Sequence, residues 1–287
     1  MKRITLPSHA KVNLYLNVLS KRPDGFHELV TLFERVGLAD DVTLEILPGE
    51  GIEVACGDPE VPSDGTNLAA RAAEAFRTAA GWPSGVRITI VKKIPVGGGL
   101  GGGSSNAATV LLGLQQLSPR KLPEEELLRL GASLGSDVGF FLLKTPWALG
   151  RGRGELLERV EIHASLWHLL VAPDFPIPTK AVYSAFVLTA PGPDVTLLSR
   201  ALRESHVPRI RDFLFNALEP TVESLYPAIR KVKDLMERKA GLARPMVSGS
   251  GSTVMALCSD REEAERAAGI LSQVQPRWRV FVASTGS

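Results

Sequence analysis

The residues best suited to chemistry form a glycine-rich loop at residues 95–105. Glycine has no Cβ, so successive backbone N–H groups can turn toward one ligand. A helix predicted at about 104–117 adds unpaired N–H donors and partial positive charge at the end of the loop. We therefore expect a cradle for a polyanion, above all a nucleoside triphosphate, in which Ser104 and Ser105 cap the helix or reach a phosphate-bound Mg²⁺. The loop residues are Pro95, Val96, Gly97, Gly98, Gly99, Leu100, Gly101, Gly102, Gly103, Ser104 and Ser105.

Other glycine-loop chemistries fit this sequence less well. A P-loop is excluded because the chain contains no Gly-Lys pair. Gly97, Gly99 and Gly102 match the dinucleotide pattern GxGxxG, but Pro119 ends the helix and no strand with a terminal acidic residue follows it. Residues 103–107 approach a nucleophile elbow with alanine in place of its last glycine, and a lone motif does not establish a triad. A glycine loop without a ligand is the purely structural alternative.

Hydrophobic periodicity predicts both strands and helices around this loop. The turn at 48–51 predicts a hairpin between strands at 42–47 and 51–55. Asp64 and Gly81 are the expected N-cap and stop of a helix at 66–80. Further strands are predicted at 11–19, 86–91, 166–172, 253–258 and 278–282, and further helices at 124–134, 182–186, 196–202, 210–213, 229–239 and 262–273.

The mixture of elements and the composition together define a class. Glycines at 150–154 interrupt the pattern about halfway, so we expect two α+β domains, residues 1–154 and 155–287. A hydrophobic fraction of 44%, a charged fraction of 22% and a net charge of +2 exclude a disordered chain and do not indicate a nucleic-acid groove. Cys56 and Cys258 form no CxxC motif. With no signal peptide or membrane-length apolar run, we expect a soluble cytoplasmic protein with no membrane, nucleic-acid or obligate protein partner.

The motifs taken together resemble those of the GHMP kinases. The glycine loop is similar to the second motif of that superfamily, and residues 10–14 and 247–253 stand where it places its first and third motifs. Residues 22–29, RPDGFHEL, resemble more narrowly the GHMP kinases whose acceptor is 4-diphosphocytidyl-2-C-methyl-D-erythritol, in the non-mevalonate isoprenoid pathway. Residues 99–108, 134–138, 177–179 and 216–219 agree with that family. The departures are Phe26 for its usual Tyr, Gly139 for Pro and Ala217 for Asp.

This resemblance implies an α+β, two-domain GHMP kinase fold with the active site in the cleft between the domains. It implies ATP-dependent phosphorylation of the acceptor's 2-hydroxyl, with Mg²⁺ carried on the ATP and no identified protein ligand for the metal. Lys11 and Asp137 match the catalytic positions. Asp137 would accept the hydroxyl proton or orient the hydroxyl, while Lys11 would keep Asp137 ionised or stabilise the alkoxide.

The same resemblance implies how the acceptor is recognised. Phe26 and Tyr183 would stack on the cytosine ring and His27 would hydrogen-bond its edge. Asn13 and Thr179 would contact the methylerythritol end. A GHMP kinase for homoserine, mevalonate or a sugar is the alternative enzyme, although those substrates have no base to stack. A nucleotide-binding regulator without catalysis is the alternative class, which the presence of Lys11 and Asp137 disfavours.

Overall fold

The computed structural model describes residues 2–188 and 192–286, and it confirms the α+β class. The chain divides into two compact units. Unit 1 comprises residues Met1–Ala10, Ala39–Val96 and Gly101–Thr145, and unit 2 comprises Lys11–Leu38, Gly97–Leu100 and Pro146–Ser287. The long strands β1 (Arg3–Lys21) and β2 (His27–Leu47) contribute residues to both units.

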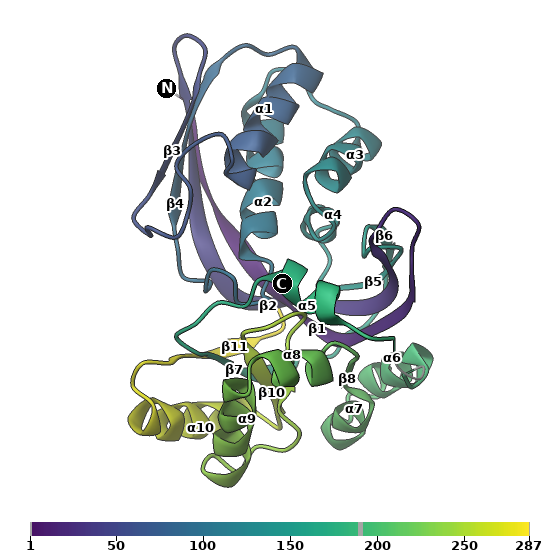
Figure 1. Ribbon diagram of the computed structural model, residues 1–287. Coiled ribbons are helices and arrows are strands. Elements are labelled where there is room, and N and C mark those ends of the chain that lie inside the picture. Colours follow the sequence, from purple (N-terminus) through teal and green to yellow (C-terminus); the bar gives the residue numbers. More distant parts are fainter. Residues whose placement is uncertain (1, 189–191, 287) are drawn as a thin grey trace. The chain divides into compact units, whose positions relative to one another are not determined.

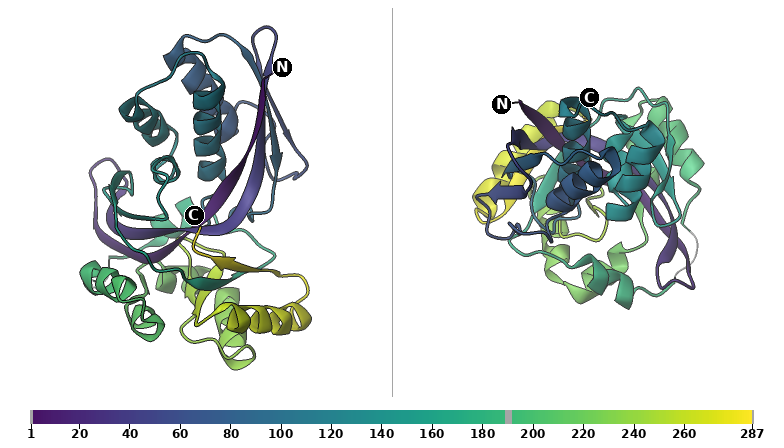
Figure 2. Two further views of the ribbon diagram at one scale, coloured as in Figure 1. Left: turned by 180° about the vertical axis from the view of Figure 1, so that it is seen from behind. Right: turned by 90° about the horizontal axis from the view of Figure 1, so that it is seen from above.

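Unit 1 is a sheet with helices on one face, as Figures 1 and 2 show. Its strands follow the order β3 (Ile52–Cys56), β4 (Gly85–Val91), β2, β1. Alternating side chains of β2 and β4, among them Val42, Leu44 and Ile88, are fully buried, because one face of the sheet is covered. The helices of this unit are α1 (Leu68–Ala80), α2 (Gly102–Leu117), α3 (Glu124–Leu134) and α4 (Val138–Leu142).

The hairpin predicted between residues 42–47 and 51–55 is wrong. Strand β3 pairs in parallel with β4, with Ile52 opposite Val86, and β4 pairs antiparallel with β2. Strand β4 therefore lies between the two segments that the turn at 48–51 connects. A parallel pair needs a crossover connection, and α1 provides it between β3 and β4. The alternation of apolar and polar residues along a strand does not determine which other strand it pairs with.

The helix boundaries follow local capping chemistry. Gly81 ends α1 in the left-handed conformation, as predicted. The N-cap of α1 is Asn67, whose side chain accepts a hydrogen bond from the Ala69 N–H, and not the predicted Asp64. Asp64 instead accepts from the N–H of Thr66, which closes a turn before the helix.

Unit 2 contains a second sheet in the order β11 (Arg279–Ser284), β7 (Trp167–Ala172), β10 (Val254–Cys258), β9 (Met246–Val247). The pairs β10–β7 and β11–β7 are antiparallel, and residues of α9 (Ala228–Arg238) and α10 (Arg261–Val274) join β7 and β10 in one hydrophobic core. Strands β5 (Trp147–Arg151), β6 (Leu156–Arg159) and β8 (Phe215–Asn216) extend the pairing of β1 and β2. The helices are α5 (Thr179–Ala185), α6 (Val195–Arg203), α7 (Val207–Phe213), α8 (Glu219–Leu225), α9 (Ala228–Arg238) and α10 (Arg261–Val274).

The glycines at 150–154 lie at the end of β5 and in the turn that joins β5 to β6, inside unit 2. A domain boundary at this point stays a prediction.

Both cysteines are free thiols, and burial raises the pKa of Cys258 to about 12. In the described part of the chain, none of the helices has the length and apolarity needed to cross a membrane.

Candidate functional site

The glycine loop turns its carbonyl oxygens toward other segments of unit 2. The carbonyls of residues 97–100 accept hydrogen bonds from the backbone N–H groups of Ile177, Thr253 and Lys11 and from the Lys11 ammonium. The N–H groups of residues 99–101 donate no hydrogen bond within residues 2–188 and 192–286. The first N–H groups of α2, which follow, have no acceptor inside the helix. The loop therefore presents consecutive donors, which is the polarity that a phosphate needs.

Only glycine fits at the centre of this loop. Gly99 has a φ of +73°, and a Cβ there would overlap the carbonyl oxygen of Ser248 and lie 2.8 Å from that of Gly251. The loop at 248–252 thus packs directly against Gly99. Gly97 and Gly101 also have positive φ values, +65° and +70°.

The expectation that Ser104 or Ser105 caps α2 is wrong. The helix begins earlier, at Gly102, with Gly101 as its N-cap, and no side chain makes a capping hydrogen bond. The buried Ser105 hydroxyl instead accepts a hydrogen bond from Ser8 at 2.8 Å. The absence of a side-chain cap leaves the helix N-terminus to a ligand. A contact of either serine with Mg²⁺ stays a prediction.

Lys11 and Asn13 lie on one face of β1 and are almost completely buried. The Lys11 ammonium donates to Asn13 Oδ1 at 2.7 Å and to the Gly99 carbonyl at 3.0 Å. Asn13 in turn donates to the Thr31 hydroxyl at 2.7 Å, which donates to the Tyr15 carbonyl at 2.8 Å. This chain of hydrogen bonds fixes a positive charge against the glycine loop.

Asp137 belongs to unit 1, at the N-cap position of α4. Its backbone is helical and its half-buried side chain makes no capping hydrogen bond. Helix capping therefore does not explain why a carboxylate stands at this position. Its catalytic role stays a prediction.

The predicted base-recognition residues lie in unit 2, and two of them are neighbours. The His27 ring is 5.4 Å from the Tyr183 ring, tilted by 35°, and 5.9 Å from the Phe186 ring, edge to face. Burial, with a smaller effect of the Lys21 charge, lowers the pKa of His27, so its imidazole is neutral at neutral pH. Phe26 is 53% exposed and the Arg153 guanidinium lies 4.8 Å from its ring centroid.

The segment that carries Phe26 and His27 is closed by ion pairs. Arg22 bridges Asp24 at 3.1 Å and Glu28 at 2.9 Å. Glu28 also accepts from the Gly152 N–H at 3.2 Å, which ties the loop to the β5–β6 turn. Exposed pairs of this kind stabilise little, but several in one loop restrict its conformation. These pairs flank Phe26 and His27 on both sides in the chain.

Thr179, the first residue of α5, is exposed and contacts the loop at 248–252. Its hydroxyl shares a hydrogen bond of 2.9 Å with the hydroxyl of Ser250.

Sequence reasoning did not single out Phe186 or Arg153 beside the predicted base-recognition residues. Their place depends on helix phase and on the β5–β6 turn, and neither leaves a motif in the sequence.

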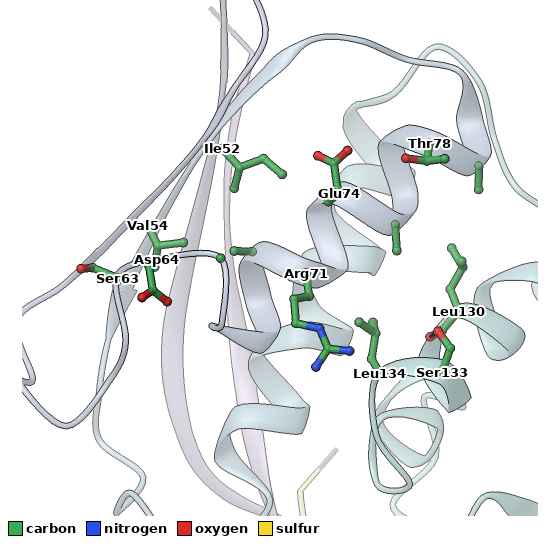
Figure 3. Close-up of a pocket in the computed structure, with 14 residues that line it drawn as sticks. Ile52, Val54, Ser63, Asp64, Arg71, Glu74, Thr78, Leu130, Ser133 and Leu134 are labelled. Carbon is green, nitrogen blue, oxygen red and sulfur yellow. Dashed lines mark hydrogen bonds between the residues drawn. The ribbon is translucent and has the colours of Figure 1, made fainter.

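A pocket of about 710 Å³ also lies in unit 1, between β3, α1 and α3 (Figure 3). Ile52 and Val54 line one side, Leu130 and Leu134 the other, and Arg71 extends from α1 between them. None of the predicted site residues lines this pocket. Among the described residues, no group of three or more His, Cys, Asp or Glu side chains could hold a metal ion.

Comparison with known proteins defines the class. The model for the GHMP kinases N terminal domain matches residues 67–145, and the model for the GHMP kinases C terminal domain matches residues 185–276. A homoserine kinase from Cytophaga hutchinsonii has the same fold, with a TM-score of 0.77 at 21% identity over 100% of this chain and 95% of that chain. The fold is that of a GHMP kinase.

Closer relatives define the family. The 4-diphosphocytidyl-2-C-methyl-D-erythritol kinase of Citrifermentans bemidjiense is 41% identical over 96% of each chain, and that of Geobacter sp. strain M21 is 42% identical over 96% of each. A crystal structure of 4-(cytidine 5'-diphospho)-2C-methyl-D-erythritol kinase matches with a TM-score of 0.84 and 37% identity, over 99% of this chain and 100% of that one. The chain belongs to the 4-diphosphocytidyl-2-C-methyl-D-erythritol kinase family.

Proposed function

We propose that the protein transfers the γ-phosphoryl group of ATP to the 2-hydroxyl of 4-diphosphocytidyl-2-C-methyl-D-erythritol. The observation that carries this proposal is the glycine loop, whose carbonyls are engaged by other segments of unit 2 while the N–H groups of residues 99–101 are left to a ligand. The acceptor follows from the family, since relatives at about 40% identity carry its name. Mg²⁺ enters as part of the nucleotide substrate.

Phosphoryl transfer needs charge stabilisation and alignment more than covalent help. In this proposal the loop and the start of α2 bind the phosphates. The Lys11 ammonium, held by Asn13 and the Gly99 carbonyl, stabilises negative charge that develops during transfer. Asp137 accepts the proton of the 2-hydroxyl or orients that hydroxyl. Asn13 and Thr179 contact the methylerythritol part of the acceptor.

A coupled assay of ADP release across candidate acceptors tests the function. We expect turnover with the cytidine diphosphate conjugate and none above background with homoserine, mevalonate or galactose. Turnover with one of the latter alone would assign the chain a different GHMP reaction. ATP binding without transfer to any acceptor would favour a regulator.

Recognition of the base gives a separate prediction. Replacing Phe26 or Tyr183 by alanine removes a stacking face worth about 1–3 kcal/mol, so the KM of the acceptor should rise about 5- to 150-fold. The KM of ATP should change little, because the glycine loop is a separate site. Phe26→Tyr should be close to neutral, since it keeps the ring. If the ATP constant rises instead, these rings line the adenine site.

The lowered pKa of His27 predicts a pH dependence. A neutral imidazole offers one donor and one acceptor, which match the N3 acceptor and the amino group of cytosine. As pH falls through a pKa that lies below the ordinary 6.5, the ring gains a proton and loses its acceptor nitrogen. We therefore expect the acceptor KM to be constant at neutral pH and to rise in acid. His27→Gln keeps a donor and an acceptor at every pH, so its KM profile should be flat; an equally steep profile in both enzymes would remove His27 from base recognition.

A further inference from the structure

A buried carboxylate lies close to the start of helix α2 in unit 1. Asp40, on β2, is fully buried and accepts four hydrogen bonds. Its Oδ1 accepts from the N–H groups of Lys93 at 2.7 Å and Ile94 at 2.8 Å. Its Oδ2 accepts from the Lys92 ammonium and from the Asn106 side-chain amide, the latter at 2.9 Å. Asp40 thus holds the segment that leads into the glycine loop.

The same network reaches the first turns of α2. The Asn106 amide nitrogen also donates to the Ser8 hydroxyl at 2.8 Å, so both of its protons are used. Ser8 in turn donates to Ser105 at 2.8 Å. Ser105 and Asn106 lie in the N-terminal part of α2. The position of the helix start therefore depends on contacts that converge on Asp40.

Lys92 brings a positive charge to this helix start. A Cβ built on Gly102, the first residue of α2, would lie 3.1 Å from Lys92 Nζ. The Lys92 side chain is only 6% exposed and the Asp40 side chain is 0% exposed. The neighbouring pair Lys93–Asp41 spans 2.8 Å with side chains 53% and 44% exposed. Of these two adjacent pairs, the buried one has its ammonium next to Gly102, at the start of α2.

The Lys92–Asp40 ion pair by itself is a weak source of stability. The desolvation of a buried ion pair often cancels its attraction, so such a pair is a poor source of stability. The ion pair does fix the position of the Lys92 ammonium, since an ammonium between a carboxylate and an amide oxygen has few alternative positions. Lys92 Nζ is also 3.4 Å from Asn106 Oδ1. The pair is therefore suited to orienting a charge.

We propose that Asp40 is a positioning residue of the nucleotide site. It fixes the Lys92 ammonium and the start of α2 relative to each other, so that the ammonium and the free N–H groups meet a nucleoside di- or triphosphate in one arrangement. This inference rests on the proposed function only in assigning the glycine loop to the nucleotide.

The test compares Asp40→Asn with Asp41→Asn, a matched change in the exposed pair. In Asp40→Asn we expect the Kd of ADP and the KM of ATP to rise about tenfold or more, as for a broken buried charge pair, with the acceptor KM unchanged. Asp41→Asn should leave all three constants unchanged. Binding of ADP is measured by calorimetry, without acceptor, so the result is readable even if the proposed acceptor is wrong.

A double variant separates positioning from folding. Lys92→Met combined with Asp40→Asn leaves no unpaired buried charge, so it should fold even if Asp40→Asn alone does not. If Asp40 acts through Lys92, the double variant should bind ADP as weakly as Lys92→Met alone, and no more weakly. Equal effects of Asp40→Asn on ATP and acceptor constants, an unchanged ADP Kd, or additive losses in the double variant would each overturn the proposal.

Discussion

Asp137→Asn is expected to lower kcat by about 100-fold or more, the usual range for losing a positioned acid–base group. The amide keeps the shape of the side chain but cannot take up the hydroxyl proton. The Kd of ATP should stay within about threefold of the parent value, because the proposed phosphate-binding residues are those of the loop at 95–105 and do not include Asp137. Single-turnover measurement with saturating ATP and acceptor, together with calorimetry of ATP, separates the two effects.

A surface variant and a second catalytic variant complete this experiment. Asp212→Asn removes an exposed carboxylate that pairs with Arg244 at 3.3 Å, and should leave kcat unchanged. If Lys11 and Asp137 act on the same step, Lys11→Met combined with Asp137→Asn should cost much less than the product of the single effects. Turnover of Asp137→Asn within about threefold of the parent would remove Asp137 from the mechanism.

Gly99→Ala should abolish measurable ATP binding and turnover. The new Cβ would overlap the Ser248 carbonyl oxygen and crowd that of Gly251, both of which are backbone atoms. The loop must move, and its N–H groups can then no longer converge on a phosphate. The left-handed φ of +73° adds about 1–2 kcal/mol for any L-residue. Calorimetry of ATP and ADP and a thermal unfolding curve measure both consequences.

Gly49→Ala is a control that separates the free-energy cost of a left-handed backbone from the cost of a steric clash. Gly49 has a φ of +78°, and no atom lies within 4 Å of the place that a Cβ would take, so alanine there meets strain without a clash. It should lower stability by about 1 kcal/mol and leave the ATP constant unchanged. If Gly99→Ala behaves like Gly49→Ala and still binds ATP, the packing of the loop at 248–252 against Gly99 is not needed for nucleotide binding.

The elements and motifs that depend on residues close together in the chain could be predicted from the sequence. The 3.6-residue period predicted α3 at 124–134 with the bounds that the structure has, and Gly81 predicted the end of α1. Glycine density predicted a tightly packed loop at 97–103, and the structure shows positive φ values there and a close backbone approach at Gly99 that only glycine fits. The segment at 22–29 identified the acceptor class, since its residues are contiguous in the chain.

Tertiary structure alone decided which distant groups meet. Strand β3 pairs with β4 across α1 and not with β2 across a four-residue turn, because pairing depends on which strands a crossover places side by side. Lys11 reaches the Gly99 carbonyl over 88 positions and Asp40 reaches Lys92 over 52, and no spacing rule links such pairs. The sequence determined the kinds of groups that the site uses. Their hydrogen-bond partners depended on the fold, because burial and contact arise only when separate segments pack together.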